Sequence, residues 1–372
     1  MTVPRGLADR LARAGRPGAV RPADRLLRAA LLPAAWAYGA AVRLRNLAYD
    51  AGLLRVHRLP CRVICVGNLT VGGTGKTPLV LALADALVRR GAKPCILLRG
   101  YGGSAPDGAV VSGGGEVLLD WRRAGDEAVL LARRLPGVPV VVGGDRLRAG
   151  ARALQRFGPD VLLLDDGFQH RRLHRDVDLV LLDAADPWGG GRLLPAGRLR
   201  EPVAGLRRAH AAVVTRADEA GDREALRRAV AGWGVPRLAW ARHRPAALVA
   251  SGPGPERPPE ALRGRAVFAL SGIGRPDSFH RTLAGLGARV VGARAFPDHH
   301  PYGDGDRTAV SRAAEASAAE WIVTTEKDLV RLEGGPGLGR PTLALRIAME
   351  LLDGAEALAP LLGVRLPEAR GV

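Results

Sequence analysis

The middle of this chain alternates short apolar runs with amphipathic stretches. The apolar runs cover residues 63–66, 95–98, 138–142, 161–164, 179–182 and 211–215. The stretches between them place apolar side chains at helical spacing over residues 77–90, 126–134 and 145–157. Strands that alternate with helices join through crossover connections, so the pattern predicts a mostly parallel sheet flanked by helices. In such sheets, ligands bind at the carboxyl ends of the strands.

A second and smaller α/β unit follows a break in this pattern. Residues 251–259 are rich in Pro and Gly, which interrupt regular elements. Beyond the break, the pattern predicts strands over residues 266–271, 289–293 and 321–325, and helices over residues 275–287 and 306–318. We therefore expect an N-terminal basic and apolar segment of residues 1–58, a main α/β domain of residues 59–250 and a smaller α/β domain of residues 251–372.

The segment after the first apolar run has the layout of a phosphate-binding loop. A glycine-rich turn follows the strand, and Lys76 with Thr77 opens the next helix, so backbone N–H groups can surround phosphate oxygens. The ammonium group of Lys76 suits the space between β- and γ-phosphates, and the Thr77 hydroxyl is of the kind that ligates Mg²⁺. Thr70 stands where the usual pattern begins with glycine. We expect a nucleoside triphosphate to be bound by Thr70, Val71, Gly72, Gly73, Thr74, Gly75, Lys76 and Thr77.

Two acids end the apolar run 161–164. Asp165 and Asp166 therefore lie at the carboxyl end of a predicted strand, on the same edge as the glycine-rich loop. In phosphate-loop enzymes, an acid at this place holds the Mg²⁺ that bridges the β- and γ-phosphates. An ordinary Asp-Asp-Gly turn is the alternative. We expect these acids to organise a metal ion or to orient the substrate.

Another acidic pair opens a predicted helix. Helix capping alone would account for Asp126 and Glu127 at this place. Transfer of a phosphate to an alcohol, however, also needs a base that accepts the hydroxyl proton. A histidine can relay that proton, and residues 296–302 contain His299 and His300. By itself, this histidine pair is equally consistent with a surface loop or with half of a metal site.

Polar and basic side chains follow the Asp-Asp acids directly. Gln169, His170, Arg171 and Arg172 would project near the edge of the sheet where ligands bind. Their basic groups could hold a phosphate of an acceptor molecule. Ordinary solvation explains the two arginines equally well.

The charge of the chain is high but dispersed. The 372 residues carry a formal net charge of +18, and aromatic residues make up only 4% of them. A nucleic-acid-binding protein more typically has a concentrated basic stripe with stacking aromatic side chains, so this class is disfavoured. The arginines fit an acidic lipid surface or a phosphorylated substrate, or they reflect a compositional bias. Residues 215–218 and 325–328 resemble the guanine-binding sequence of GTPases only weakly, which disfavours GTP.

Cysteine usage indicates a reducing compartment. The chain has three cysteines, Cys61, Cys65 and Cys95, in or beside predicted strands. An odd number at such places does not suggest structural disulfides. No second Cys or His pair accompanies Cys61 and Cys65 at the spacing of metal ligands, so buried thiols are favoured over a zinc site.

The N-terminal segment combines basic and apolar positions. Residues 1–28 are rich in Arg and Pro, and residues 29–42 form an apolar stretch that contains Trp36 and Tyr38. This stretch is shorter than the ~20 residues that a membrane span needs. It also lacks the cleavage site of a secretory signal. A helix in the headgroup region of an anionic leaflet and a helix packed on the protein's own core both fit.

These motifs, in this order, resemble the tetraacyldisaccharide 4′-kinase (lipid A 4′-kinase) family. The matching segments are residues 67–78, 99–102, 125–127, 165–176, 296–300 and 324–328. The resemblance covers about residues 20–350, and the sequence of residues 165–170 is highly specific. It implies a P-loop NTPase-type kinase that transfers the γ-phosphate of ATP to the 4′-hydroxyl of tetraacylated glucosamine disaccharide 1-phosphate, at the cytoplasmic face of the inner membrane. The family has Pro after its Gly-Asp-Glu sequence, where this chain has Ala128.

The resemblance also implies roles for individual residues. Lys76 would stabilise the β- and γ-phosphates, while Asp126 with His299 would accept the hydroxyl proton. Bound Mg²⁺ would be organised by Thr77, Glu127, Asp165 and Asp166. The acceptor would be contacted by Asn68, Arg99, Gln169, His170 and Arg171.

The implied reaction brings two partners, the acylated disaccharide lipid and the anionic inner-membrane surface. We expect no nucleic acid and no obligate protein partner. Because a tetraacylated acceptor is met at the bilayer surface, the resemblance favours an interfacial helix over residues 29–42. The domain of residues 251–372 would close the cleft over ATP and exclude water. The main alternative is a membrane-peripheral GTPase or ATPase switch, which gives Asp126 and His299 no role.

Overall fold

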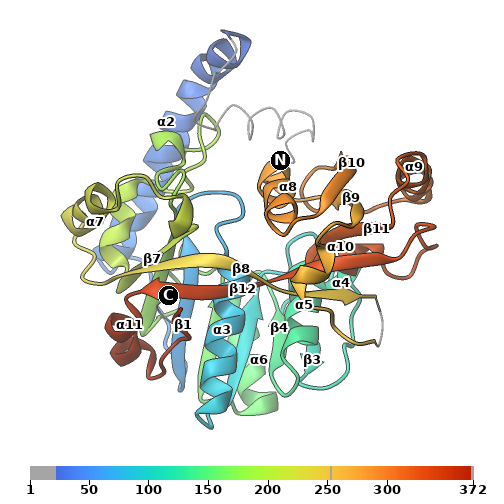
Figure 1. The fold of residues 1–372 in the computed structure, drawn as a ribbon. Coiled ribbons are helices and arrows are strands. Elements are labelled where there is room, and N and C mark those ends of the chain that lie inside the picture. The colour runs from blue at the N-terminus through green and yellow to red at the C-terminus, as the bar shows by residue number, and fades with distance from the viewer. Residues whose placement is uncertain (1–21, 252–253, 370–372) are drawn as a thin grey trace. The chain divides into compact units, whose positions relative to one another are not determined.

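The computed structural model describes residues 22–251 and 254–369, and it divides them into two compact units (Figure 1). Unit 1 contains the described residues of Met1–Arg99, Gly143–Arg242 and Met349–Val372. Unit 2 contains those of Gly100–Val142 and His243–Ala348. Both units are discontinuous along the chain, so they cut across the three continuous segments expected from the sequence. The boundaries of those segments stay a prediction, and residues 1–21 of the first segment lie outside the described residues.

Unit 1 is built on a parallel sheet. Its strands lie in the order β8-β7-β6-β1-β5-β2, and each neighbouring pair in this order is parallel. The elements of this unit are α2 (Pro22–Asp50), β1 (Arg62–Asn68), α3 (Lys76–Arg89), β2 (Pro94–Leu98), α6 (Arg146–Phe157), β5 (Val161–Asp165), β6 (Val177–Asp183), η1 (Gly189–Gly191), η2 (Val203–Arg208), β7 (Ala211–Thr215), η3 (Ala217–Glu219), α7 (Arg223–Gly232) and α11 (Ala355–Leu362). Strands β8 (Leu238–Ala250) and β12 (Thr342–Asp353) each continue from one unit into the other. The predicted parallel sheet with flanking helices is confirmed.

The apolar runs explain why this sheet forms. All residues of β2, β5, β6 and β7 are buried, as expected for parallel strands that are covered on both faces. Helix α3 packs against β1, β2 and β5, and its buried Leu79, Leu83 and Leu87 recur at helical spacing. Cys65 and Cys95 are buried free thiols within β1 and β2, as the sequence predicted.

The carboxyl ends of these strands gather the predicted nucleotide-binding segments. Strand β1 ends at Asn68, directly before the glycine-rich loop, and β5 ends at Asp165. The two strands are neighbours in parallel register, with Val66 paired with Asp165. The glycine-rich loop and Asp166 therefore leave the sheet at the same edge, because parallel strands place their carboxyl ends on one side.

Unit 2 combines a parallel four-strand segment with an antiparallel pair. Its parallel strands lie in the order β10-β9-β11-β12, and β3 pairs with β4 antiparallel. Its elements are β3 (Ala109–Gly113), α4 (Trp121–Ala124), α5 (Asp126–Arg134), β4 (Pro139–Val142), η4 (Pro259–Leu262), β9 (Ala266–Ser271), α8 (Pro276–Gly285), β10 (Arg289–Ala295), α9 (Asp304–Ala316), β11 (Trp321–Thr325) and α10 (Glu326–Leu332). Helix α5 begins at Asp126 although Ala128 replaces the family's Pro, and it packs against α10.

Helix α2 is longer than the apolar stretch predicted from the sequence. It extends from Pro22 to Asp50, and Ala35, Gly39 and Val42 on one of its faces are buried. Three of its other apolar side chains stay largely exposed: Trp36 at 70%, Leu44 at 71% and Leu47 at 63%. Among the described helices, none is both long enough and apolar enough to cross a membrane. The helix thus packs on the protein with one face and leaves apolar side chains uncovered.

Strand β1 leaves no space for a side chain at Gly67. A Cβ atom there would lie 2.5 Å from Cβ and 3.0 Å from the backbone nitrogen of Phe168, which follows the Asp-Asp-Gly turn. We predict that Gly67→Ala lowers the free energy of unfolding by ~1–3 kcal/mol, because the turn must shift. A chemical denaturation midpoint measures this change. Gly232→Ala is the matched control, since a Cβ atom there meets nothing within 4 Å, and equal midpoints for the two variants would contradict the prediction.

Candidate active site

The glycine-rich loop of unit 1 has the backbone geometry of an anion-binding turn. Gly72 and Gly75 adopt φ angles of 111° and 88°, which are accessible to glycine and strained for other residues. Gly75 precedes α3, so the N-terminal N–H groups of the helix open toward the loop. Asn68 Nδ2 donates to Thr74 Oγ1 at 3.0 Å, and Thr215 Oγ1 donates to the carbonyl of Thr74 at 2.8 Å. The loop is therefore fixed from β1 and from β7.

A carboxylate between two cations lies beside this loop. Asp166 Oδ1 lies 3.6 Å from Lys76 Nζ, and Arg200 Nη1 donates to both carboxylate oxygens of Asp166 at 2.7 and 2.8 Å. Burial opposes ionisation of Asp166, but the charges of Lys76 and Arg200 outweigh it and lower the pKa to about 2. Asp166 has a φ of 59°, and its backbone nitrogen donates to the carbonyl of Val66 at 2.9 Å. The turn after β5 thus presents an ionised acid to Lys76.

The acids and the threonine predicted to organise Mg²⁺ in unit 1 supply oxygen donors. Asp165 is buried at the end of β5, and Thr77 is buried in the first turn of α3. Carboxylate and hydroxyl oxygens are the ligands that Mg²⁺ prefers, and this ion commonly completes its shell with phosphate oxygens and water. Among residues 22–251 and 254–369, no group of three His, Cys, Asp or Glu side chains is placed to hold a metal ion alone. The donor set fits an ion that is shared with a nucleotide.

The residues predicted to contact the acceptor lie in different surroundings within unit 1. Gln169 Nε2 donates to the backbone carbonyl of Asn68 at 2.9 Å, so Gln169 supports the end of β1 from which the phosphate-binding loop begins. Burial and the charge of Arg146 lower the pKa of His170 to about 4, which keeps this ring neutral at pH 7. Arg99 is exposed directly after β2.

Arg171, also predicted to contact the acceptor, is held by the end of α2. Its guanidinium donates to the carbonyl of Asn46 at 2.9 Å and to Asp50 Oδ1 at 2.5 Å. It also lies over the ring of Tyr49, 5.1 Å from the centroid. In the structure this arginine therefore ties α2 to the segment that follows the Asp-Asp acids.

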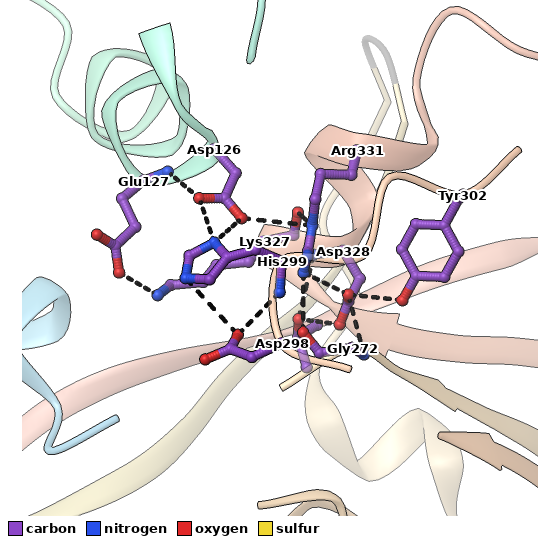
Figure 2. Close-up of polar contacts among 10 residues, drawn as sticks. Asp126, Glu127, Gly272, Asp298, His299, Tyr302, Lys327, Asp328 and Arg331 are labelled. Carbon is purple, nitrogen blue, oxygen red and sulfur yellow. Dashed lines mark hydrogen bonds and ion pairs between the residues drawn. The ribbon is translucent and has the colours of Figure 1, made fainter. Parts of the chain in front are cut away.

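Asp126 and His299 form a hydrogen-bonded pair within unit 2 (Figure 2). Asp126 opens α5 after Gly125, and His299 lies in the loop after β10 with a φ of 60°. His299 Nδ1 lies 2.9 Å from Asp126 Oδ2 and 3.1 Å from Asp126 Oδ1. The ring of Tyr101 packs beside the imidazole, with centroids 5.3 Å apart. The structure therefore brings together the two residues that the sequence nominated as a proton-accepting pair.

The two members of this pair shift each other's ionisation. Burial opposes ionisation of Asp126, but the hydrogen bond from His299 and the charge of Lys327 lower its pKa to about 2. Burial also disfavours protonation of His299, yet its bond to Asp126 raises the pKa of the imidazole above its usual value. An ionised Asp126 can only accept, so His299 Nδ1 carries the proton. In the neutral ring, Nε2 can accept another proton, and it lies 3.8 Å from Asp298 Oδ1.

Glu127 was predicted to help hold the metal, and in unit 2 it pairs with Lys327. Burial disfavours the charged form of Lys327, but Glu127 and Asp126 raise its pKa above the usual range. His300, the second histidine of the motif, bonds to Asp306 at 2.8 Å and stacks on Phe296. Residues 325–328, compared above with a guanine-binding sequence, thus place Lys327 beside the carboxylates of α5.

Three cations near the predicted residues were missed by the sequence analysis. Lys327 could have been found by the same signal as Lys76, because both belong to a chain with only three lysines. Arg200 and Arg331 carried no such signal, since arginine is abundant throughout the chain. Arg331 Nε lies 3.3 Å from Asp126 Oδ2 and is almost fully buried.

The chain is similar to known kinases over most of its length. The model of the family described as tetraacyldisaccharide-1-P 4′-kinase matches residues 27–364. A relative from Anaeromyxobacter dehalogenans (strain 2CP-C), named tetraacyldisaccharide 4′-kinase, is 48% identical over 350 residues, which cover 92% of this chain and 91% of the relative. A relative of the same name from Syntrophus aciditrophicus (strain SB) is 45% identical over 332 residues, which cover 84% of this chain and 87% of the relative.

A solved structure has a similar fold. It is the "apo" form of LpxK from Aquifex aeolicus in complex with ATP, with a TM-score of 0.75 and 38% sequence identity. The match covers 91% of this chain and 98% of that chain. The matched residues extend across both units.

The raised pKa of His299 predicts a pH-dependent contribution to stability. The protonated ring favours the folded state, so this contribution is complete below the ordinary pKa of ~6.5 and is lost as pH rises through the raised folded value. His299→Gln should be less stable than the wild type by ~1–3 kcal/mol near pH 6, with a smaller difference at alkaline pH. Denaturant unfolding over a pH series measures this difference. A difference that does not change with pH would contradict the assignment.

Proposed function

We propose that this chain, which belongs to the tetraacyldisaccharide-1-P 4′-kinase family, transfers the γ-phosphate of ATP to the 4′-hydroxyl of a tetraacyldisaccharide 1-phosphate. The observation that carries this proposal is the hydrogen-bonded pair of Asp126 and His299 in a chain that also has a phosphate-binding loop. A nucleotide switch needs the loop alone, whereas transfer to an alcohol also needs a group that accepts a proton. The alternative of a membrane-peripheral switch is therefore not favoured.

Unit 1 would hold the nucleotide. The backbone N–H groups of residues 70–77 would surround the phosphate oxygens, with the N-terminus of α3 directed at their negative charge. Lys76 and Arg200, which both contact Asp166, would stabilise the charge that develops on the γ-phosphoryl group. ATP as the nucleotide is supported by the ATP complex of the similar Aquifex aeolicus protein.

Thr77, Asp165 and Asp166 would hold the Mg²⁺ that accompanies the nucleotide. When bound, this ion neutralises charge on the β- and γ-phosphates. Glu127, the remaining acid proposed for the ion, is bound to Lys327 in unit 2. Coordination by Glu127 would therefore have to compete with that ammonium group.

Unit 2 would accept the proton. His299 Nδ1–H donates to Asp126, so the lone pair of Nε2 can take the proton from the 4′-hydroxyl. The hydroxyl oxygen then forms a bond to the γ-phosphorus while the bond from the γ-phosphorus to the β-bridging oxygen breaks, which releases ADP. The negative charge of Asp126 stabilises the imidazolium that forms, as the raised pKa of His299 indicates.

The acceptor and the membrane would be met by α2. Its exposed Trp36, Leu44 and Leu47 would enter the headgroup region, with Arg43 and Arg45 beside anionic lipid. The buried face of the same helix is fixed to unit 1, since Tyr38 donates its hydroxyl to the carbonyl of Arg200 at 2.6 Å. One face of α2 would thus lie in the headgroup region, while another face packs on the protein's own core. We place the reaction at the cytoplasmic face of the inner membrane.

Phosphate transfer from labelled ATP to tetraacyldisaccharide 1-phosphate in detergent micelles tests the reaction. We expect label in the lipid with the wild type and none above background with Lys76→Ala. Asp126→Asn should lower kcat by ~10²-fold or more, because the proton acceptor loses its counter-charge. Nucleotide affinity of Asp126→Asn, measured by equilibrium binding, should stay within about two-fold of the wild type, because Asp126 would act in proton transfer and not in nucleotide binding. Hydrolysis of ATP or GTP with no labelled lipid would favour the nucleotide switch.

Membrane attachment is tested with substitutions on the exposed face of α2. The triple variant Trp36→Glu, Leu44→Glu, Leu47→Glu should reduce the fraction bound to phosphatidylglycerol vesicles by ~10-fold or more, since each apolar side chain loses its favourable burial. Leu118→Glu is the matched control, because Leu118 belongs to unit 2 and is also an exposed leucine, with 55% of its surface accessible. Co-sedimentation measures binding. Equal binding by both variants would contradict the assignment of α2 as the membrane anchor.

A further inference from the structure

A nearly fully buried arginine lies next to Asp126 of the proton-accepting pair. Arg331 of α10 is 1% exposed, and its Nε lies 3.3 Å from Oδ2 of Asp126, which is itself 3% exposed. A guanidinium removed from water needs several acceptors, because its desolvation is costly. Its Nη2 group donates to Asp328 Oδ1 at 2.6 Å and to the carbonyl of Gly272 at 3.1 Å. Arg331 therefore connects Asp126 to the interior of unit 2.

The inner end of this connection cannot move easily. Asp328 is fully buried, and its Oδ1 also accepts from the backbone nitrogen of Gly272 at 3.0 Å and from the Tyr302 hydroxyl at 2.7 Å. Thr325 Oγ1 donates to Oδ2 of Asp328 at 2.6 Å. Both oxygens of Asp328 are bound by groups from the residue after β9, from β11, from α10 and from the loop after β10, so Asp328 fixes the direction in which Arg331 points.

We propose that Arg331 is a positioning residue for proton transfer, which keeps the carboxylate of Asp126 turned toward His299 Nδ1 so that His299 Nε2 can accept the hydroxyl proton. Figure 2 shows Asp126 between the imidazole on one side and the guanidinium on the other. The proposal rests on the proposed function. Arg331 acts through Asp126 and is assigned no contact with substrate.

The surroundings of Asp126 support a local role. Helices α5 and α10 are also joined by Glu127 with Lys327, and by Arg134 Nη1 with Glu326 Oε2 at 2.7 Å. These ion pairs do not involve Arg331, so the two helices stay joined when Arg331 is replaced. The change would then act on the orientation of Asp126, and on Asp328 and the carbonyl of Gly272, which lose their bonds to Arg331 Nη2.

The charges around His299 define the effect that a substitution should have. Asp126 from α5 and Asp298 from its own loop favour the protonated ring, while Lys327 from α10 disfavours it and the ring of Tyr101 packs alongside. Glu127, which binds Lys327, and Arg331, which lies beside Asp126, add one further charge of each sign next to these partners of His299. Removing the positive charge of Arg331 leaves Asp126 with less compensation, which favours the imidazolium. A protonated Nε2 cannot accept the hydroxyl proton, so activity should be lost first at low pH.

Steady-state kinetics over a pH series test this expectation in the full chain. Arg331→Met should lower kcat at pH 7 by ~10-fold or more, move the acidic limb of the kcat profile to higher pH and leave KM for ATP within about two-fold. Arg331→Lys should restore part of kcat, because it returns the charge without the fixed guanidinium geometry.

A second buried arginine of unit 2 provides the matched control. Arg307 is 6% exposed and donates to the backbone carbonyls of Tyr302 and Pro336. Arg307→Met should lower the denaturation midpoint without moving the kcat profile along the pH axis. A loss in Arg331→Met that is the same at every pH, or unchanged activity, would overturn the positioning role.

The ¹⁵N NMR signals of the His299 ring test the role of Arg331 without an assay of phosphate transfer. In ¹⁵N-histidine-labelled wild type, the neutral His299 ring should carry its proton on Nδ1, and His299→Gln identifies its signals. Arg331→Met should raise the pKa of His299 and mix the two tautomers, whereas Arg307→Met should leave both unchanged. If the wild type phosphorylates no lipid, the proposed function fails, and the ¹⁵N signals still decide whether Arg331 orients the pair. Identical signals in wild type and Arg331→Met would refute that orientation.

Discussion

Each unit depends on keeping a carboxylate ionised, buried at Asp126 and partly buried at Asp166. A carboxylate removed from water takes up a proton unless nearby cations and hydrogen-bond donors hold it charged. Asp166 meets this condition through Lys76 and Arg200, and Asp126 meets it through its bond to His299. In both cases the acid lies at the end of a strand or helix, which fixes its position, while its partners come from other elements. The rest of each site is arranged around that charge.

The same constraint explains why unit 2 buries a second ion pair. The pair of Arg331 and Asp328 adds little net stability, because desolvation offsets most of the attraction between two buried charges. Its geometry is nevertheless closely specified, with Asp328 bound by Tyr302, by Thr325 and by a backbone nitrogen. An apolar pair would fill the same space without directing a charge at Asp126. The physical gain is therefore orientation of the acid in front of His299.

The predictions from sequence succeeded where one local signal determines the structure. Residues 211–215, 266–271 and 321–325 form strands with the predicted bounds, because continuous apolar runs must be buried in a sheet. Strands β8 and β12 were missed, since their residues mix buried, partly buried and exposed positions and give no clear alternation. Helix α2 extends beyond the predicted stretch 29–42 at both ends, because residues 22–28 and 43–50 contain basic and polar side chains that interrupt the apolar pattern.

The sequence by itself determined the phosphate-binding loop, the parallel sheet and the resemblance to one kinase family. These depend on residues close together in the chain, where glycine φ angles and apolar spacing act locally. Only the tertiary structure decided which side chains meet. Asp126 and His299 are 173 positions apart, and Lys76 and Arg200 reach Asp166 from different elements. Electrostatic attraction acts through space, so no spacing along the chain could reveal that Arg331 lies beneath Asp126.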